Sequence, residues 1–579
     1  MACRARDKLC GRIATSRAWR RHRSSVKCSM EQHRWWTGFG PAKTCSECGA
    51  AVTADGLCLA HLCDAAFATI LDRLTVGTLT LDLRGVDIDN ERWTAIRIAL
   101  TPNMIRGPDL SSARLAHATL GDRAGLWRAT FSDGADLRGV TFGDGASLRG
   151  ALFGDGADLR GATFGDRADL RGATFGDRAD LSGATFGDRA DLSGATFGDG
   201  ADLSGATFGD RANLRGATFG DGADLSRATF GDGASLAETW FVGNASLAIA
   251  TFRRQQRAIG PLYAGGAIDF HGAQFGIETR LEVDADRVVL SRAVFAGPVE
   301  VRALRARIEA SETRFEGRAA IGRLDPARRP QTKIPGNPRQ DREGALLRHA
   351  DAADASVWSL RRTDVSQLTI AGVRIDEARF AGAQGLERLR LIDTSFEKRA
   401  GRQRVAEEAL LDAGEEEPTA DEQRMGHPKA TAEQVAEIYR SLRKSREDSA
   451  DAPGGNDLYV GEQEMRRRAL RELPIATRGH RALLALYAWV GGYGVRSVFP
   501  SAALVVLLGA GWALAIWIGL KTGDTFDALV FVLRSVLLLP NSDNVTTTTA
   551  GDGLQVVLRV LGPLLIGLIA LGVRAQVKR

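Results

Sequence analysis

The chain has 579 residues, which is long enough for several domains. Its formal net charge of +5 gives no nucleic-acid-binding signature for the protein as a whole. All seven cysteines precede residue 64, so no disulfide can staple the rest of the chain, and this distribution suits a reducing compartment.

Residues 1–29 are rich in arginine and show no hydrophobic periodicity. The segment Met1–Met30 also lacks the apolar stretch that a secretory signal needs. We interpret residues 1–29 as a disordered basic tail, or as an upstream extension that is not translated, with Met30 as the start. The alternative is a nucleic-acid-binding arm.

A metal-ligand pattern follows, with Cys45 and Cys48 forming one knuckle and Cys58 and His61 the other. Each knuckle presents two ligands from a tight turn, so the four side chains predict one structural Zn²⁺ with no open coordination position. Cys63 is a spare or substitute ligand. The alternative is that these cysteines are free thiols packed as small hydrophobic side chains.

Two short helices are predicted before the most regular part of the chain. Residues 59–74 can form an amphipathic helix, and the first β pattern begins near Leu79. A second helix over Asn90–Leu100 is expected to cover the open end of the array that follows, because an exposed strand edge invites pairing with other chains.

Phenylalanine recurs every eleven residues from Phe131 to Phe252, and leucine runs between at the same period. One unit, Ala162–Gly172, reads ATFGDRADLRG. Such a fixed short period indicates a stacked array. A right-handed coiled coil also has an eleven-residue period, but each glycine would cost roughly 1 kcal/mol in a helix. We therefore predict short strands with Leu, Phe and Ala inward, and Gly-Asp at the corners.

The repeat resembles the pentapeptide-repeat family, whose motif is A-(D/N)-L-x-x, at Ala168–Gly172 and Ala212–Gly216. The resemblance implies a mainly β fold, a right-handed quadrilateral β-helix. The sixth residue of alternate units is expected to enlarge one corner in two. If two units make one coil, residues 22 apart stack in register. The expected inner columns are Phe153, Phe175, Phe197, Phe219 and Phe142, Phe164, Phe186, Phe208.

The five-residue pattern loosens after Phe252 but returns, after a long loop at 323–348, as far as about residue 397. Two amphipathic helices follow, separated by Asp451–Gly455. The first has Val435, Ile438, Tyr439 and Leu442 at helical spacing. The pair resembles one tetratricopeptide-like unit, which cannot stand alone, so its apolar face should dock on the β-helix or a partner.

Phe499–Leu520 is uncharged for 22 residues, about 33 Å as a helix, and Gly553–Val573 is a second candidate span. Phe526–Leu539, at about 21 Å, is too short to cross and is predicted to be re-entrant or to lie on the surface. Arg559 is expected near the outer interface or in a polar cavity. This order resembles the pore module of two-helix ion channels, although the potassium filter sequence TVGYG is missing.

Basic residues flank both spans, whereas acidic residues offset the basic ones in the loop between them. The positive-inside rule then predicts a cytoplasmic β-helix and C-terminus, with the loop Asn541–Gly551 outside. The flanking basic residues are Arg478, Arg481, Arg496, Arg574, Lys578 and Arg579.

The whole arrangement also resembles bacterial membrane-anchored pentapeptide-repeat proteins with a two-helix tail, a resemblance that carries no defined activity. The segments that carry it are Gly260–Leu262, Phe380–Ala383, Ala436–Arg440, Glu464–Arg467 and Gly562–Leu564. The predicted division of the chain is 1–29 basic tail, 30–76 zinc-knuckle module, 77–397 β-helix (most regular over 110–252), 398–430 charged linker, 431–473 helical hairpin, 474–497 interfacial segment and 498–579 membrane domain.

No catalytic constellation is evident in the sequence, so we expect no enzyme activity and no cofactor beyond the one zinc ion. The leading interpretation is a membrane-anchored scaffold that binds an unidentified protein. The second is a channel-like protein with the β-helix as cytosolic sensor. The third is a DNA-mimicking topoisomerase inhibitor, which 18 acidic residues diluted by 10 arginines over Phe131–Phe252 make weak. Expected partners are the lipid bilayer, a protein and, through the membrane domain, further copies of the chain, but no nucleic acid.

Overall fold

A computed structural model of the chain describes residues 59, 62, 64–75, 81–101, 107–254, 258–325, 355–394, 396–399, 402–413, 430–449, 451–470, 498–519, 524–540 and 546–577. The chain divides into two compact units, Met1–Ser356 and Val357–Arg579, and each is described by itself. The predicted basic tail, most of the 323–348 loop and the segment 474–497 lie outside the described residues.

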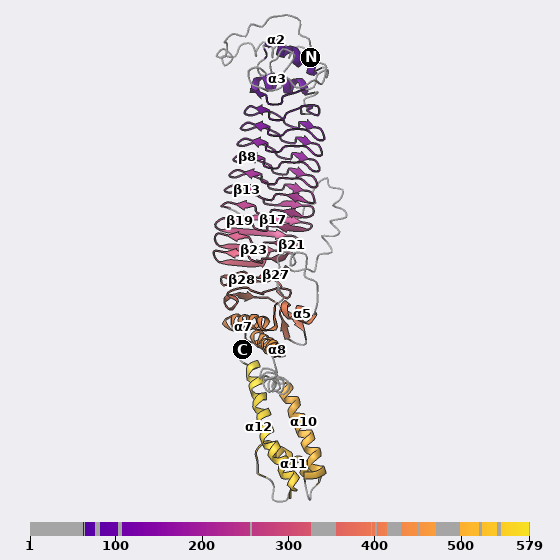
Figure 1. The fold of residues 1–579 in the computed structure, drawn as a ribbon, viewed down its shortest axis with the longest axis vertical. Helices are drawn as coiled ribbons and strands as arrows, with labels where there is room; N and C mark the ends of the chain where they lie inside the picture. Colours follow the sequence, from indigo (N-terminus) through magenta and orange to yellow (C-terminus); the bar gives the residue numbers. More distant parts are fainter. Residues whose placement is uncertain are drawn as a thin grey trace. The chain divides into compact units, whose positions relative to one another are not determined.

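The first unit is a parallel β-solenoid whose coils stack along one axis (Figure 1). Its strands are short because Thr-Phe or Ala-Asp pairs alternate with turn residues, and successive coils pair in parallel. One sheet contains β1 (Asp87–Ile88), β2 (Thr119–Leu120), β4 (Thr141–Phe142), β6 (Thr163–Phe164), β8 (Thr185–Phe186), β10 (Thr207–Phe208), β13 (Thr229–Phe230), β16 (Thr251–Phe252), β19 (Gln274–Phe275), β22 (Val294–Phe295) and β25 (Arg314–Phe315).

A second sheet of the first unit contains the intervening Thr-Phe pairs and then longer strands. Its members are β3 (Thr130–Phe131), β5 (Leu152–Phe153), β7 (Thr174–Phe175), β9 (Thr196–Phe197), β11 (Thr218–Phe219), β14 (Thr239–Phe241), β17 (Ile259–Ala264), β20 (Thr279–Asp284), β23 (Val299–Ala303) and β26 (Ala319–Arg323). The third sheet contains β12 (Ala223–Asp224), β15 (Ala245–Ser246), β18 (Ala267–Asp269), β21 (Arg287–Val289) and β24 (Arg307–Glu309).

The core of the solenoid is a set of inward columns, as predicted. Phe153 stacks on Phe175 at a centroid distance of 4.6 Å, and Phe164 stacks on Phe186 at 4.8 Å. The repeat leucines and alanines are buried as well, including Leu170. Two eleven-residue units therefore make one coil, and the prediction of two separate phenylalanine columns is confirmed.

Both kinds of corner are four-residue turns, over 170–173 and 165–168 in one coil. In each turn the N–H of the last residue donates to the carbonyl of the first, at 3.0 and 3.2 Å, and the third residue is left-handed. The extra residue of the longer unit is Gly165, whose N–H donates to the Phe142 carbonyl one coil earlier at 2.8 Å. It therefore lengthens a face of the coil, and the expectation of an enlarged corner is wrong.

The coil becomes shorter beyond Phe252. Phe252 pairs with Phe275, and the next pairings join Phe275, Phe295 and Phe315 at intervals of 20 residues. Four faces of five residues account for that interval. The longer strands of the second sheet begin in the same region, which is why the sequence pattern loosens there while the β-solenoid continues.

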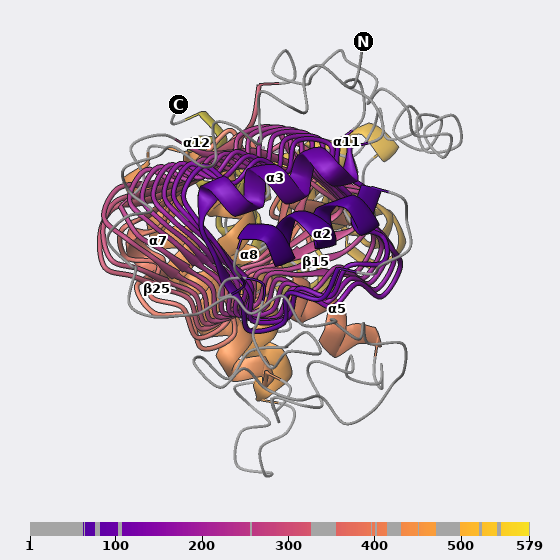
Figure 2. The same ribbon diagram turned by 90° about the horizontal axis from the view of Figure 1, so that it is seen from above.

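Two helices, α2 (Asp64–Thr75) and α3 (Asn90–Leu100), lie across the N-terminal end of the solenoid (Figure 2). Asp89 caps α3 by accepting a hydrogen bond from the Arg92 backbone N–H. The Arg92 guanidinium donates to the carbonyls of Leu59 and Leu62, and Trp93 is buried. The predicted capping helix is confirmed.

The second unit begins within β27 (Ser356–Ser359) and continues with short solenoid elements before its helices. Its elements are β28 (Leu368–Ala371), the 3-10 turn η3 (Leu386–Arg388), β29 (Arg390–Ile392), β30 (Glu397–Arg399), β31 (Arg402–Arg404), α5 (Ala406–Ala413), α7 (Ala432–Asp448), α8 (Ala452–Ala469), α10 (Val498–Leu514), the π-helical turn η6 (Ala515–Gly519), α11 (Thr525–Val536) and α12 (Thr549–Val577). Helices α10 and α12 agree with the two predicted spans.

Helices α7 and α8 pack on one another, and α7 docks on the last solenoid elements of this unit. Its predicted apolar residues Val435, Ile438, Tyr439 and Leu442 are buried. The predicted break between the helices is wrong in one respect, because α8 already begins at Ala452. Asp451 caps it by accepting from the Gly454 N–H, and proline is tolerated in a first helical turn.

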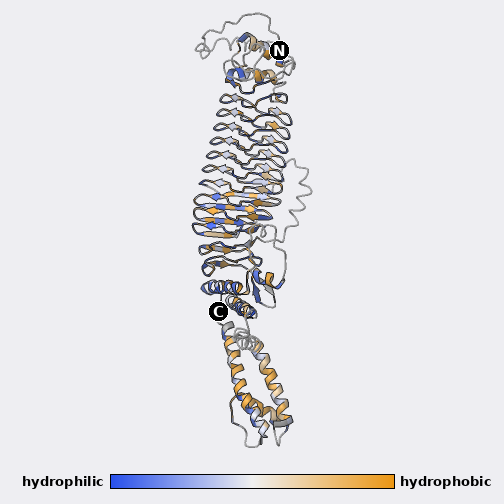
Figure 3. Cartoon of the chain, viewed as in Figure 1, coloured by the Kyte–Doolittle hydropathy of each residue, from blue (hydrophilic) through white to orange (hydrophobic). Residues whose placement is uncertain are grey.

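Helices α10, α11 and α12 form an apolar group (Figure 3). Phe531 and Val532 of α11 pack with Ala515 and Leu558 in a buried cluster. The Arg559 guanidinium donates to the Leu539 carbonyl, near the end of α11, at 3.4 Å. By length and composition, Val498–Trp517 and Thr549–Leu571 are long and apolar enough to cross a membrane.

Candidate functional site

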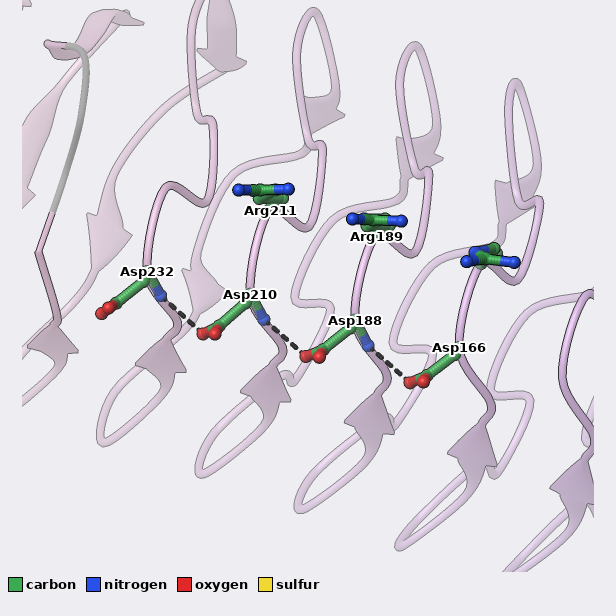
Figure 4. Close-up of a pocket in the computed structure, with 7 residues that line it drawn as sticks. Asp166, Asp188, Arg189, Asp210, Arg211 and Asp232 are labelled. Atoms are coloured by element: carbon green, nitrogen blue, oxygen red, sulfur yellow. Dashed lines mark hydrogen bonds between the residues drawn. The ribbon is translucent and has the colours of Figure 1, made fainter.

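The predicted zinc ligands Cys45, Cys48, Cys58 and His61 lie outside the described residues, so the zinc site remains a prediction. Within the described part of the chain, no group of three or more His, Cys, Asp or Glu side chains is placed to hold a metal ion. The most prominent polar site there is a groove along one corner of the solenoid (Figure 4).

This groove has a volume of about 480 Å³. We call it the Asp/Arg corner, and it is lined by Asp166, Arg167, Asp188, Arg189, Asp210, Arg211 and Asp232. Consecutive Asp-Arg pairs lie one coil apart, so the corner has three rungs, each with one carboxylate and one guanidinium, followed by Asp232. The aspartates form one column and the arginines a parallel column beside it (Figure 4).

The aspartate column is fixed by hydrogen bonds that run from coil to coil. The Asp188 N–H donates to the Asp166 carboxylate at 2.9 Å, and Asp210 and Asp232 repeat this bond at 2.8 Å each. In each case only Oδ1 accepts this bond from the next coil. The aspartates therefore have a structural role as well as an exposed charge, which their sequence-based interpretation as solvated corner residues did not include.

Glycine precedes each aspartate because the coils approach closely at this point. A Cβ added at Gly187 would lie 2.6 Å from Asp166 Oδ1 and 2.7 Å from the Asp166 backbone nitrogen. Real Cβ atoms essentially never come so close, so this position requires glycine. The aspartate of each rung is thereby held in direct contact with the coil before it.

The arginines of the corner differ from the other repeat arginines. On a neighbouring face Arg171 forms a salt bridge with Asp169 at 2.6 Å, and this partner lowers the pKa of Asp169. By contrast, Arg167, Arg189 and Arg211 have no ion pair or hydrogen bond to any described side chain. Their guanidinium groups are exposed. They remain available to a partner.

The arginines also occupy a backbone conformation that does not favour them. Arg167, Arg189 and Arg211 have φ of 57°, 60° and 59°, in the left-handed region. The diagonally opposite corner has the same turn but places glycine at this position in four coils. Those glycines are Gly134, Gly156, Gly200 and Gly222, with Arg178 as the exception. The alternation of Gly-Asp-Gly and Gly-Asp-Arg in the sequence was the signal that could have revealed this asymmetry.

A second polar cluster, in the second unit, has a structural role. Arg402 of β31 donates to Glu408 of α5 at 2.9 Å and to Glu464 of α8, and the Tyr439 hydroxyl of α7 donates to Glu408. Burial and the nearby Glu408 raise the pKa of Tyr439 above its ordinary value. The network joins three helices and a hairpin in a region predicted to be a charged linker, 398–430. That prediction is wrong for 402–413, because these charges pair with one another out of solvent.

Gly461 permits this packing. A Cβ at Gly461 would lie 2.6 Å from Cε1 of the Tyr439 ring, so α8 can approach α7 closely only with glycine there. Glu407, next to the network, accepts hydrogen bonds from the backbone N–H groups of Phe380 and Ala381 through Oε1. Burial raises the pKa of this carboxyl group.

Comparison with known proteins supports the interpretation of the repeat. A family model described as pentapeptide repeats (9 copies) matches residues 126–174 and 170–218. A comparison with curated proteins finds no match. The matched residues are those whose coils stack at 22-residue intervals and form the Asp/Arg corner. The repeat match and the parallel β-solenoid together show that this chain belongs to the pentapeptide-repeat family.

Proposed function

We propose that the chain is a membrane-anchored scaffold without catalytic activity, whose β-helix binds a protein partner on the cytoplasmic side. The observation that carries the anchoring is the exposure of the two apolar helices. Only 17% of the apolar window of each is buried, whereas the core helix of a soluble protein would be mostly buried. Val505, Val506 and Trp517 are 68, 69 and 83% exposed, as lipid-facing side chains would be.

Membrane extraction tests the anchoring. The full chain should stay in the membrane pellet after washing with alkaline carbonate. A chain truncated after Leu470 keeps the β-helix and the helical hairpin but lacks α10, α11 and α12, and it should be released. Release of the full chain under the same conditions would contradict the proposal.

The binding surface of the scaffold is best supported at the Asp/Arg corner. Its rungs are regular, exposed and held by backbone hydrogen bonds, so a partner would meet a rigid surface. No chemistry on a substrate is needed to explain such an arrangement. A protein partner is favoured over a nucleic acid because an aspartate lies beside each arginine and would repel phosphate groups.

The proposed topology places both termini in the cytoplasm, following the basic residues that flank the two spans. A fluorescent tag that functions only in the cytoplasm should be bright after Arg579. A periplasmic-type reporter fused at the same position should be inactive. The reverse pattern would mean an odd number of spans and would overturn this topology.

A channel-like activity is the second candidate, and the packing of α11 favours it. This helix has 12 residues, about 18 Å, and packs between the two spans through Phe531, Val532 and Val536. A short helix in this place is what a pore module would need. Single-channel recording from purified protein in bilayers distinguishes the two candidates, since a scaffold should give no discrete conductance.

A further inference from the structure

We propose that the Asp/Arg corner is a self-association surface, through which two copies of this chain pair side by side with their solenoid axes parallel. This inference rests on the proposed function, because it names the protein partner of the scaffold as a second copy of the chain. Four observations support it: the backbone strain at the arginines, the spacing of the rungs, the order of their charges and the free guanidinium groups.

The strain shows that the arginines are retained against local preference. A side chain in the left-handed region is disfavoured relative to glycine, and the opposite corner uses glycine in the same turn. Three consecutive coils nevertheless carry Arg167, Arg189 and Arg211. Their guanidinium groups contact no described carboxylate, so the fold itself gains no ion pair from them. A contact outside the chain accounts for their presence.

The spacing of the rungs limits what that contact can be. Coils stack at 4.8 to 4.9 Å, as the rings of Phe164, Phe186 and Phe208 show. A single extended peptide places side chains of one face about 6.6 Å apart, and an α-helix rises about 5.4 Å per turn. Neither can address consecutive rungs. A second solenoid of the same kind has the required spacing.

The order of charges favours pairing of like chains in one orientation. Aspartates and arginines form two parallel columns (Figure 4). A two-fold axis parallel to the solenoid axis brings the aspartate column of one copy opposite the arginine column of the other, and the reverse. A two-fold axis perpendicular to it would place like charges opposite each other. The corner is therefore self-complementary only in the parallel arrangement, which two chains anchored in one bilayer can adopt.

Such a contact is weak in solution and stronger on a membrane. One exposed ion pair strengthens association by a factor of about 1.4 to 5. Three facing rungs form about six pairs, so the corner strengthens pairing about tenfold or more. Anchoring in a bilayer raises the effective concentration of the copies, which makes a weak contact sufficient.

The first test uses the full chain, tagged with a fluorescent protein after Arg579 and reconstituted in vesicles at low density. Counting of photobleaching steps should show two copies for the natural sequence. The triple variant R167G/R189G/R211G should associate about tenfold more weakly. Its unfolding temperature should be no lower, because glycine relieves the left-handed conformation. The matched control, Arg178→Gly on the opposite corner, should leave pairing unchanged.

The second test identifies the contact. In the variant R189K, a carbodiimide can couple the introduced lysine amine to an aspartate carboxylate with loss of water. Mixing light and heavy isotope-labelled chains in the vesicles distinguishes links between copies. We expect the introduced lysine to be joined to Asp166, Asp188 or Asp210 of the other copy, and we expect no such link for R178K.

The outcomes separate the inference from the proposed function. Full chains that insert in vesicles but remain single, or that pair equally well as the triple glycine variant, overturn the self-association and leave the anchored scaffold standing. If the lysine of the R189K variant forms links only within one chain, the self-association is overturned too. Failure of the chain to insert overturns the proposed function itself.

Discussion

Phe164 and Phe186 are 22 residues apart in the chain, yet their rings stack at 4.8 Å with their planes 2° apart. Phe175, which lies eleven residues from each of them, belongs to the opposite column and stacks on Phe197. The coil of two repeat units is therefore the structural period of the array. Each ring of a column has an aromatic neighbour above and below it.

Replacement of Phe186 by alanine should remove one ring from the middle of a column and leave a cavity between Phe164 and Phe208. We expect a loss of about 3–5 kcal/mol in the free energy of unfolding. The neighbouring Thr185→Ala, at an exposed position, should change it by less than about 0.5 kcal/mol. Denaturant unfolding of both variants checks this, and equal effects would mean that the rings do not form a continuous stack.

Gly187→Ala should destabilise the array more than Gly183→Ala, although both replace a repeat glycine. At Gly183 the new Cβ meets nothing within 4 Å, and the left-handed φ of 64° costs about 1–2 kcal/mol. At Gly187 it would lie 2.6 Å from Asp166 Oδ1, so the coils must separate. Thermal unfolding of the two variants should rank them in this order, and the reverse order would refute the close approach.

Glu407→Gln should stabilise the second unit at neutral pH and have little effect in acid. Burial raises the pKa of Glu407 above its ordinary value of 4.5 in the folded state, so the folded chain holds this proton more tightly. As pH rises above about 4.5, the unfolded chain ionises first and stability is lost up to the folded-state pKa. Glutamine does not ionise, and its carbonyl oxygen can still accept from Phe380 and Ala381.

The measurement is the unfolding temperature of the full chain in detergent at pH 4.5 and pH 8. The advantage of Glu407→Gln over the natural sequence should grow from the lower to the higher pH. The exposed Glu437, on α7, provides the control, and Glu437→Gln should show no such growth. An advantage that shrinks as pH rises would show that the carboxylate form is the favoured one.

Zinc analysis of the purified full chain tests the predicted knuckle module. One zinc ion per chain is expected, and replacing Cys45 and Cys48 by serine should remove it because two of four ligands are lost. Replacing Cys63 alone should keep the metal if it is only a spare ligand. A chain without stoichiometric zinc would favour the free-thiol interpretation.

Much of the solenoid could be predicted because its information is local and repeated. The period of Phe and Leu defined the inner columns, and the bounds of α3 followed from a helical pattern beside a strand edge. The extra residue of the longer unit could not be assigned so easily. Its position depends on the hydrogen bond from Gly165 to Phe142, a residue 23 positions earlier.

The region around α5 shows the limit of sequence reasoning. Residues 402–413 are rich in charge, and that composition alone predicts a linker. Their partners, Tyr439 and Glu464, lie more than 30 residues further along the chain, and only the fold brings them to Arg402 and Glu408. The Asp/Arg corner could not be predicted for a related reason, since exposure without a partner is visible only in three dimensions.

The two-unit coil also restricts how such a chain can change length. Loss or gain of 22 residues within the regular region removes or adds one whole coil and leaves every later residue on the same side of the axis. Loss of a single eleven-residue unit instead rotates everything after it by half a turn. Phenylalanines of one column would then continue into the other, and the core would tolerate the exchange, but rungs of the Asp/Arg corner on either side of the deletion would face opposite directions. Copy number in this array can therefore drift by pairs of repeats without dividing its surface, whereas a change by one repeat does divide it.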